Sequence, residues 1–291
     1  MIWFVYAVLS AFLAALASIV EKHVLARVHS TDFSLLISFL VAVLSLPFFF
    51  ILPLDTLTPK VLFAIWLASL LGSFAFLEIT KGVRHLEISN SAPLFLLSPF
   101  LTALLAYFVI GETLTNLQLL GVGLLALGTY VLETKNMRDV HGFITNFFGD
   151  RYARFIFLGL IFYAVTSIID RIILSRWGVP PMLLVSTAHI FILINFSLYF
   201  ISQHRSALGI RETLLSSWRE LLLLALLMFA YRLAYAYAVA LAAIALVVAI
   251  KRSSSLFTTI IGGQLFHDHS LLRKSVACTI MICGVALMAL P

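Results

Sequence analysis

The chain has 291 residues, of which 62% are hydrophobic and only 11% are charged. A water-soluble domain carries roughly a quarter charged residues, so a fully water-exposed surface is excluded, and the mean hydropathy of +1.10 indicates that lipid surrounds the protein. The net charge of +6 is spread over several polar segments and forms no basic patch with interleaved aromatic residues, which excludes nucleic acid as the expected partner and leaves the lipid bilayer.

Ten apolar runs follow one another along the chain. About 20 apolar residues span a bilayer core as a helix, and none of these runs alternates as a strand would. The first run directly follows Met1 with no basic segment before it, so it reads as a membrane helix rather than a cleaved signal. The sequence predicts an all-α membrane protein of ten transmembrane helices, near residues 2–26, 33–53, 61–80, 87–110, 116–133, 155–175, 181–202, 219–240, 241–265 and 272–290.

The two halves of the chain resemble each other. The segment Ser18-Ile19-Val20-Glu21-Lys22 matches Ser167-Ile168-Ile169-Asp170-Arg171 at a shift of 149 residues. At a shift of 156 residues, Ser98, Thr102, Glu112 and Gly128 match Ser254, Thr258, Asp268 and Gly284. Because five helices per copy is an odd number, the second copy must enter the membrane from the opposite face, as in many secondary transporters. We expect inverted repeats at 1–134 and 154–291, a polar linker at 135–153 and a central cavity; the alternative is a duplicated scaffold without transport.

Basic residues are distributed unequally between the two expected membrane faces. The positive-inside rule assigns the richer face to the cytoplasm. For a multi-pass protein of the plasma (cell inner) membrane, this places the linker in the cytoplasm and both termini on the opposite side of the membrane. The poorer face carries Lys60 and Arg176, whereas the richer face carries Arg27, Lys81, Arg84, Lys135, Arg138, Arg151, Arg154, Arg205, Arg211, Arg219, Arg273 and Lys274.

Charged residues inside the apolar runs are the strongest functional signal. Each costs about 2.5–3.5 kcal/mol on insertion scales, and the eight are Glu21, Lys22, Glu78, Asp170, Arg171, Arg232, Lys251 and Arg252. The basic members outnumber the acidic ones, which favours an anionic ligand. Four of them, Glu21, Lys22, Asp170 and Arg171, lie towards the ends of the first and sixth runs. The alternative for these four is that they pair with one another or that their side chains extend to the membrane interface.

Two polar stripes predict a shared cavity. Lys251 and Arg252 lie about ten residues inside the ninth run, too deep for easy snorkelling, and Lys251 shares one helix face with Ser254, Ser255, Thr258 and Gly262. A weaker stripe of Ser91, Ser98 and Thr102 lies in the fourth run, interrupted by Pro93 and Pro99; packing through small residues is the alternative for both stripes. The expected substrate-binding set is Asn90, Ser98, Thr102, Tyr231, Arg232, Tyr235, Lys251, Arg252, Ser254, Ser255 and Thr258. For the tyrosines, an interfacial aromatic belt is the alternative.

Other candidates carry weaker signals. Glu78 in the third run is the candidate for proton coupling, since burial in hydrocarbon favours a protonated carboxyl. Glu112 and Asp268 occupy short turns at matching positions, which favours helix capping or gating. The segment His267-Asp268-His269 has no converging ligands, so it predicts a solvated turn and not a metal site. Cys278 and Cys283 read as buried small hydrophobes. No nucleophile or nucleotide-binding motif occurs, so we expect no cofactor, no metal and no enzyme activity.

Over nearly its whole length the chain resembles the EamA-like branch of the drug/metabolite transporter superfamily. The resemblance rests on Ser91-Ala92-Pro93-Leu94, Pro99-Phe100-Leu101-Thr102, Gly111-Glu112-Thr113-Leu114, Gln118-Leu119-Leu120-Gly121 and Gly128 in the first half, and on Ala236-Tyr237-Ala238, Ser255-Leu256-Phe257-Thr258, Gly262 and Asp268 in the second. It implies a ten-helix basket with a central cavity lined by both repeats. It also implies secondary transport of metabolites, often export, of solutes such as amino acids, nucleosides or drugs.

The chain departs from the family pattern at several points. Asp268 stands where the family usually has Glu, the ninth run lacks its usual proline, and many relatives keep both termini in the cytoplasm. Phe95 and Leu96 of the first repeat stand where the second has Lys251 and Arg252, so this basic pair is expected to set selectivity. We expect a transporter of a small polar or anionic metabolite, or a drug-like solute, that works by alternating access. A passive pore and a membrane-embedded lipid-modifying enzyme are the alternatives, and proton coupling and export stay open.

Overall fold

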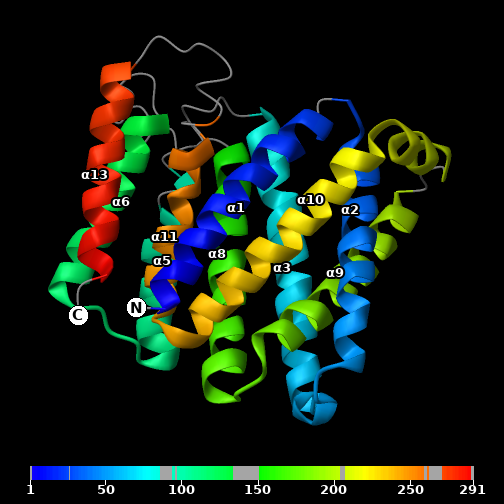
Figure 1. Cartoon of the computed structure of the whole chain (residues 1–291), viewed down its shortest axis with the longest axis horizontal. Coiled ribbons are helices and arrows are strands. Elements are labelled where there is room, and N and C mark those ends of the chain that lie inside the picture. Colours follow the sequence, from blue (N-terminus) through cyan, green and yellow to red (C-terminus); the bar gives the residue numbers. More distant parts are fainter. Residues whose placement is uncertain are drawn as a thin grey trace.

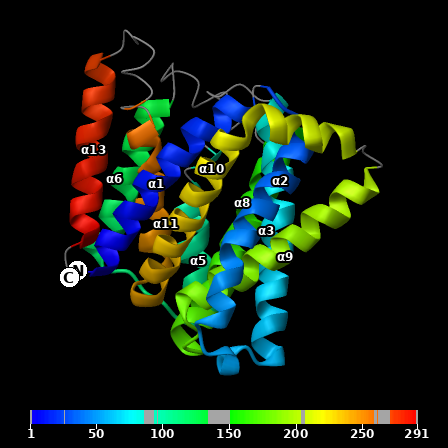
Figure 2. The ribbon, with the colours of Figure 1, turned by 45° about the vertical axis from the view of Figure 1, so that its right-hand side comes forward.

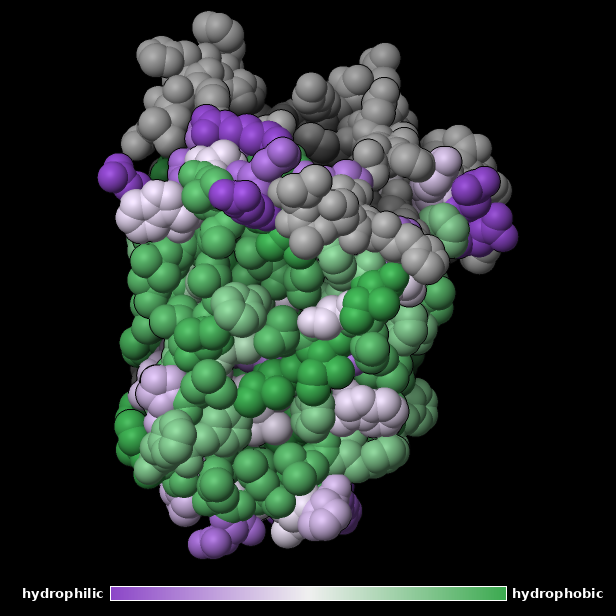
Figure 3. Space-filling view, turned by 90° about the vertical axis from the view of Figure 1, so that its right-hand side faces the viewer, coloured by the Kyte–Doolittle hydropathy of each residue, from purple (hydrophilic) through white to green (hydrophobic). Residues whose placement is uncertain are grey.

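The computed structural model describes residues 2–25, 27–85, 94–95, 97–133, 151–203, 207–258, 261 and 271–289. Within these residues every regular element is a helix and no strand occurs. On the face seen in Figure 3, a broad apolar belt separates two polar ends, which is the surface that a bilayer requires. The expectation of an all-helical membrane protein is confirmed.

The helices follow the apolar runs of the sequence. In the first half they are α1 (Ile2–Leu25), α2 (Ser30–Ser45) with the 3-10 helix η1 (Leu46–Phe50), η2 (Leu54–Thr56), α3 (Pro59–His85), α5 (Leu97–Ile110) and α6 (Asn116–Glu133). In the second half they are α8 (Arg151–Arg171) with the π-helix η4 (Ile172–Arg176), α9 (Pro181–Ser202), α10 (Ala207–Leu241), α11 (Ile244–Arg252) and α13 (Leu271–Ala289).

Six segments of the described chain are long and apolar enough to cross a bilayer. They are Ile2–Leu25, Thr31–Phe50, Pro59–Ile79, Arg151–Arg176, Pro181–Ser202 and Gly209–Leu241. Three shorter apolar helices, Leu97–Ile110, Asn116–Val131 and Val276–Ala289, accompany them. The protein is therefore a multi-pass membrane protein.

Two helices differ from the expected boundaries. α10 begins at Ala207 and not near 219, because a first helical segment that carries Arg211 and Glu212 precedes the apolar run and joins it at a kink at Ser217 (φ −138°, ψ 24°). Figures 1 and 2 show these turns bending away at one end of the bundle. The expected ninth span is interrupted, since α11 ends at Arg252 and the chain turns at Ser253 before it becomes helical again.

The helices pack in pairs around the middle of the bundle. α6 packs along α13 at one edge, α2 packs on α9 towards the other, and α1 on α10 and α3 on α8 lie between them (Figures 1 and 2). The N- and C-terminal ends lie at the same end of the bundle (Figure 1). One expectation about α13 is wrong: Cys283 is exposed on this helix and not buried, because among the described residues no helix covers that face of α13.

Close helix contacts in this bundle require glycine. A Cβ on Gly284 of α13 would lie 2.7 Å from the carbonyl oxygen of Gly121 and 2.7 Å from the amide nitrogen of Leu125, both in α6. In the α3–α8 pair, a Cβ on Gly159 would lie 2.9 Å from the carbonyl oxygen of Ala75. Small residues allow backbones to approach in this way, and van der Waals packing then stabilises the helix pair in lipid.

We predict that Gly284→Ala destabilises the protein by about 1–3 kcal/mol, because the added methyl group forces α6 and α13 apart. Thermal unfolding of the purified protein in detergent measures this effect. The matched control is Gly123→Ala in the same helix pair, where nothing lies within 4 Å of the added Cβ. Equal melting temperatures for the two variants would contradict the requirement for glycine.

Candidate functional site

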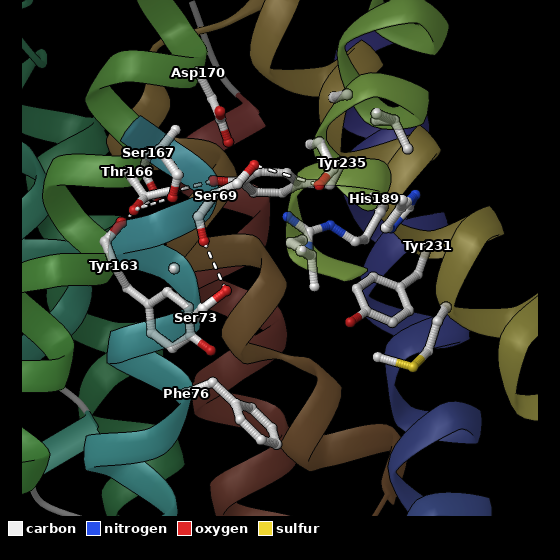
Figure 4. A pocket seen from close by; sticks show the side chains of 18 of the residues that line it. Ser69, Ser73, Phe76, Tyr163, Thr166, Ser167, Asp170, His189, Tyr231 and Tyr235 are labelled. Atoms are coloured by element: carbon white, nitrogen blue, oxygen red, sulfur yellow. Dashed lines mark hydrogen bonds between the residues drawn. The ribbon is translucent and has the colours of Figure 1, made fainter. Parts of the chain in front are cut away.

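A cavity of about 370 Å³ lies inside the bundle, with walls from both halves of the chain. The lining residues belong to α1, α2, α3, α5, α8, η4, α9, α10 and α11, and Ser254 follows α11. Figure 4 shows side chains of α3 and α8 on one side of this space and side chains of α9 and α10 on the other. A cavity of this volume suits a small metabolite.

Lys251 and Arg252 both line the cavity at the end of α11. Cations are favoured at this position because the C-terminal end of a helix carries partial negative charge. The Lys251 Nζ lies 4.6 Å from the ring centroid of Tyr235 and 5.3 Å from that of Tyr231. The Lys251 ammonium therefore lies next to two aromatic rings of the cavity wall.

Arg252 is fixed by the first half of the chain. Its Nε donates a hydrogen bond to the Ser98 hydroxyl (2.8 Å), and its guanidinium lies 5.4 Å from the ring centroid of Phe95. Ser98 and Thr102 of α5 also line the cavity, and the Thr102 hydroxyl donates to the Ser98 carbonyl (2.8 Å). The fourth and ninth spans thus meet at one cavity wall, as their polar stripes predict.

Tyr231, Arg232 and Tyr235 of α10 complete this side of the cavity. The Tyr235 hydroxyl donates to the Ser167 hydroxyl (3.3 Å), a contact drawn in Figure 4 that connects α10 to α8. The two tyrosines line an interior space, so an interfacial belt does not describe them. His189 also lines the cavity, and its Nδ1 lies 3.3 Å from the hydroxyl of Ser45.

Two acidic residues of the cavity wall, Glu21 and Asp170, were not predicted as site residues. No hydrogen bond or ion pair joins either carboxylate to the described residues, and with Arg232, Lys251 and Arg252 they leave one positive charge in excess. A signal for them exists in the sequence, because they occupy equivalent positions of the matching segments of the first and sixth runs. Hydroxyl groups missed by the sequence reasoning also line the cavity: Ser34, Ser38, Ser69, Ser73, Thr166 and Ser167.

Several predicted site residues lie elsewhere. Ser255 and Thr258 are not among the lining residues, because the turn at Ser253 interrupts the stripe, and their hydroxyls donate to the carbonyls of Arg252 (3.1 Å) and Ser254 (2.9 Å). Ser254 itself lines the cavity. Glu78 lies one residue before the end of the apolar part of α3 and does not line the cavity. Asn90, Ser91, Pro93, Gly262 and residues 267–269 lie outside the described residues.

Glu112 and Arg171 form an ion pair outside the cavity. The Arg171 Nε lies 2.5 Å from a carboxylate oxygen of Glu112, and the two side chains are 16% and 18% exposed. The other carboxylate oxygen accepts a hydrogen bond from the Ile244 N–H (2.9 Å), so Glu112 caps the first turn of α11. The expectation of a capping role is confirmed, although the capped helix belongs to the other half of the chain. Lys22, in contrast, is exposed near the end of α1.

The described residues contain no group of three or more His, Cys, Asp or Glu side chains that could hold a metal ion. The cavity instead combines cations, carboxylates, hydroxyls and aromatic rings, which suits reversible binding of a polar solute.

Comparison with known proteins identifies one family. Residues 1–134 match the EamA-like transporter family. No curated protein matches the sequence. A protein of known crystal structure superposes on this chain with a TM-score of 0.73, over 99% of this chain and 95% of that chain, at 14% sequence identity. At this identity the likeness concerns the fold alone.

Water access to the cavity is testable by thiol labelling. In a background carrying Cys278→Ala and Cys283→Ala, we predict that Thr166→Cys reacts with a hydrophilic thiol reagent, because Thr166 lines the cavity and the thiolate forms in water. The matched control is Ser186→Cys, at a residue with 0% exposure that does not line the cavity. Equal labelling of the two variants would contradict a wet cavity.

Proposed function

We propose that the protein is a secondary transporter that moves a small polar or anionic metabolite by alternating access. The match of residues 1–134 to the EamA-like transporter family, which is consistent with the drug/metabolite transporter superfamily, supports this proposal. Members of this family are transporters and not enzymes. The observation that carries the proposal is the cavity wall, where five charged side chains from α1, α8, α10 and α11 face one space inside a membrane protein. Charges at such depth are tolerated where they line a wet cavity or bind a charged solute.

We further propose ten membrane helices in two inverted repeats, residues 1–134 and 154–291, joined by a cytoplasmic linker at 135–153 in the plasma membrane. The packing pattern supports this arrangement. The sequence match relates α1 to α8, and the order of the helices within each expected repeat relates α3 to α10. Exchange of the repeats then turns the α1–α10 pair into the α8–α3 pair, and both pairs pack along each other. Inverted repeats of this kind can open a central site to either face in turn.

In this proposal the basic residues bind the anionic group of the solute. Lys251, Arg252 and Arg232 supply the positive charge, and the hydroxyls of Ser98 and Ser254 offer further hydrogen bonds. Tyr231 and Tyr235 pack against the body of the solute and hold the Lys251 ammonium in place. Selectivity comes from the second repeat, because the first repeat has Phe95 and Leu96 at the equivalent positions.

A proton-coupled cycle would use Glu21 and Asp170 rather than Glu78. Both carboxylates line the cavity, whereas Glu78 does not. A carboxylate next to the bound anion is repelled by the like charge of the anion, and protonation of the carboxylate removes this repulsion. Proton transfer at these positions therefore accompanies solute binding in this proposal.

We expect Lys251→Ala and Arg252→Ala each to weaken solute binding by roughly 10- to 100-fold, because a hydrogen bond to a charged group contributes about 1.5–3 kcal/mol. A thermal-shift screen of the purified protein against small carboxylates and phosphates identifies the solute, since a ligand stabilises the folded state. Flux into proteoliposomes then gives KM for each variant. Ser255→Ala, next to the pair but outside the cavity wall, is the control. Unchanged KM in both basic variants would remove them from the site.

A transporter and a passive pore differ under an imposed proton gradient. The proposal predicts uptake of the identified solute above its external concentration, and Asp170→Asn should abolish this accumulation while solute binding persists. The measurement is radiolabelled uptake with and without a protonophore. A pore only equilibrates the solute, so uptake that never exceeds the external concentration under any ion gradient would contradict secondary transport.

A further inference from the structure

One polar network joins the two halves of the chain next to the cavity. We call it the latch: the carboxylate of Glu112, the guanidinium of Arg171, the carbonyls of Val239 and Ala240, and the Ile244 N–H. Arg171 binds Glu112 through Nε and donates from Nη1 to the carbonyls of Val239 (2.5 Å) and Ala240 (3.2 Å). Glu112 also accepts the Ile244 N–H (2.9 Å). Both carboxylate oxygens of Glu112, and the Nε and Nη1 of Arg171, therefore have partners in other elements.

The latch holds three separate parts of the chain at one point. Glu112 lies in the segment between α5 and α6, Arg171 ends α8, and the backbone partners lie on both sides of the turn between α10 and α11. A second contact reinforces it nearby, because Arg176 Nη2 donates to the carbonyl of Ile110 (2.6 Å). The latch therefore ties the first half of the chain to the second half.

The latch lies just beyond the cavity, towards the end of the bundle that carries both termini. Tyr235 and Ala236 of α10 line the cavity, and Val239 and Ala240 follow one helical turn later. Similarly, Val248 of α11 lines the cavity, and Ile244 precedes it by one turn. α10 ends and α11 begins at the same end as the N-terminus (Figure 1). The latch thus lies between these cavity-lining residues and the termini end of the bundle.

We infer that the latch is the gate on the termini side of the membrane, closed in this structure, and that the Glu112–Arg171 pair must separate before the cavity opens to that side. This inference rests on the proposed alternating-access function. Two features connect the gate to the cavity: Asp170, which lines the cavity, immediately precedes Arg171, and the helix changes to π geometry directly after it. Short π segments within helices occur frequently at functional sites.

The test measures access to the cavity from the termini side without any solute. The reporter is Val248→Cys in the background of Cys278→Ala and Cys283→Ala, labelled with a membrane-impermeant thiol reagent added at that face. Glu112→Gln removes the charge and keeps an acceptor for Ile244 N–H; Arg171→Gln removes the other charge. We expect both to label at least about tenfold faster than the parent, the change in a two-state equilibrium that corresponds to about 1.4 kcal/mol.

The controls remove single charges from the same end of the bundle without touching the latch. They are Lys60→Gln, whose ammonium lies over Trp177, and Asp55→Asn in η2. Both are expected to label as slowly as the parent. If the two glutamine variants label at the parent rate, or if all four variants accelerate equally, the gate is overturned.

A further variant covers the case in which a glutamine variant does not fold. Arg171→Lys keeps the charge but lacks the planar set of guanidinium N–H donors that binds the α10 carbonyls. Its labelling rate should therefore be higher than that of the parent and lower than that of Arg171→Gln. A rate equal to the parent would again overturn the gate. Because labelling uses no solute, its outcome is independent of the flux measurements. Unchanged labelling would overturn the gate and would leave the transport function to be tested by flux, whereas accelerated labelling without any solute flux would contradict only the transport function.

Discussion

The cost of an unpaired charge in hydrocarbon determines how this protein is built. A buried ionic group must face water, a partner or a ligand, and the bundle satisfies this requirement in two different ways. Arg171 and Glu112 satisfy each other and the free backbone groups of the turn between α10 and α11. Lys251, Arg232, Glu21 and Asp170 instead line a cavity of about 370 Å³.

These two solutions lie one helical turn apart on α10 and α11. Under the proposed function, polar groups in the cavity bind a solute, whereas those in the latch hold both halves of the chain together. Where a helix breaks, its freed carbonyls and amides need partners. Here Arg171 of the same half binds the carbonyls, and Glu112 of the other half accepts the Ile244 N–H. Helix interruption, charge placement and the contact between the halves are therefore one structural feature.

Much of the fold was predictable from the sequence because lipid restricts the possible structures. Only helices satisfy the backbone within a single apolar segment, so the apolar runs predicted α1, α3, α6 and α9 closely. The kinked start of α10 was not predicted, since Arg211 and Glu212 interrupt the apolar pattern there. The break at Ser253 was not predicted either, because neither glycine nor proline marks it, and this break takes Ser255 and Thr258 off the cavity wall.

By itself, the sequence determined the helical class, the membrane environment, the duplicated segments and the presence of basic residues too deep to reach the interface. These properties depend on composition and spacing along one chain. Tertiary structure alone decided which charges meet. Glu21 and Asp170 join Lys251 at the cavity, while Arg171, the direct neighbour of Asp170, turns to Glu112. Adjacent residues of a helix point about 100° apart, so the partner of each is set by helices that are distant in sequence.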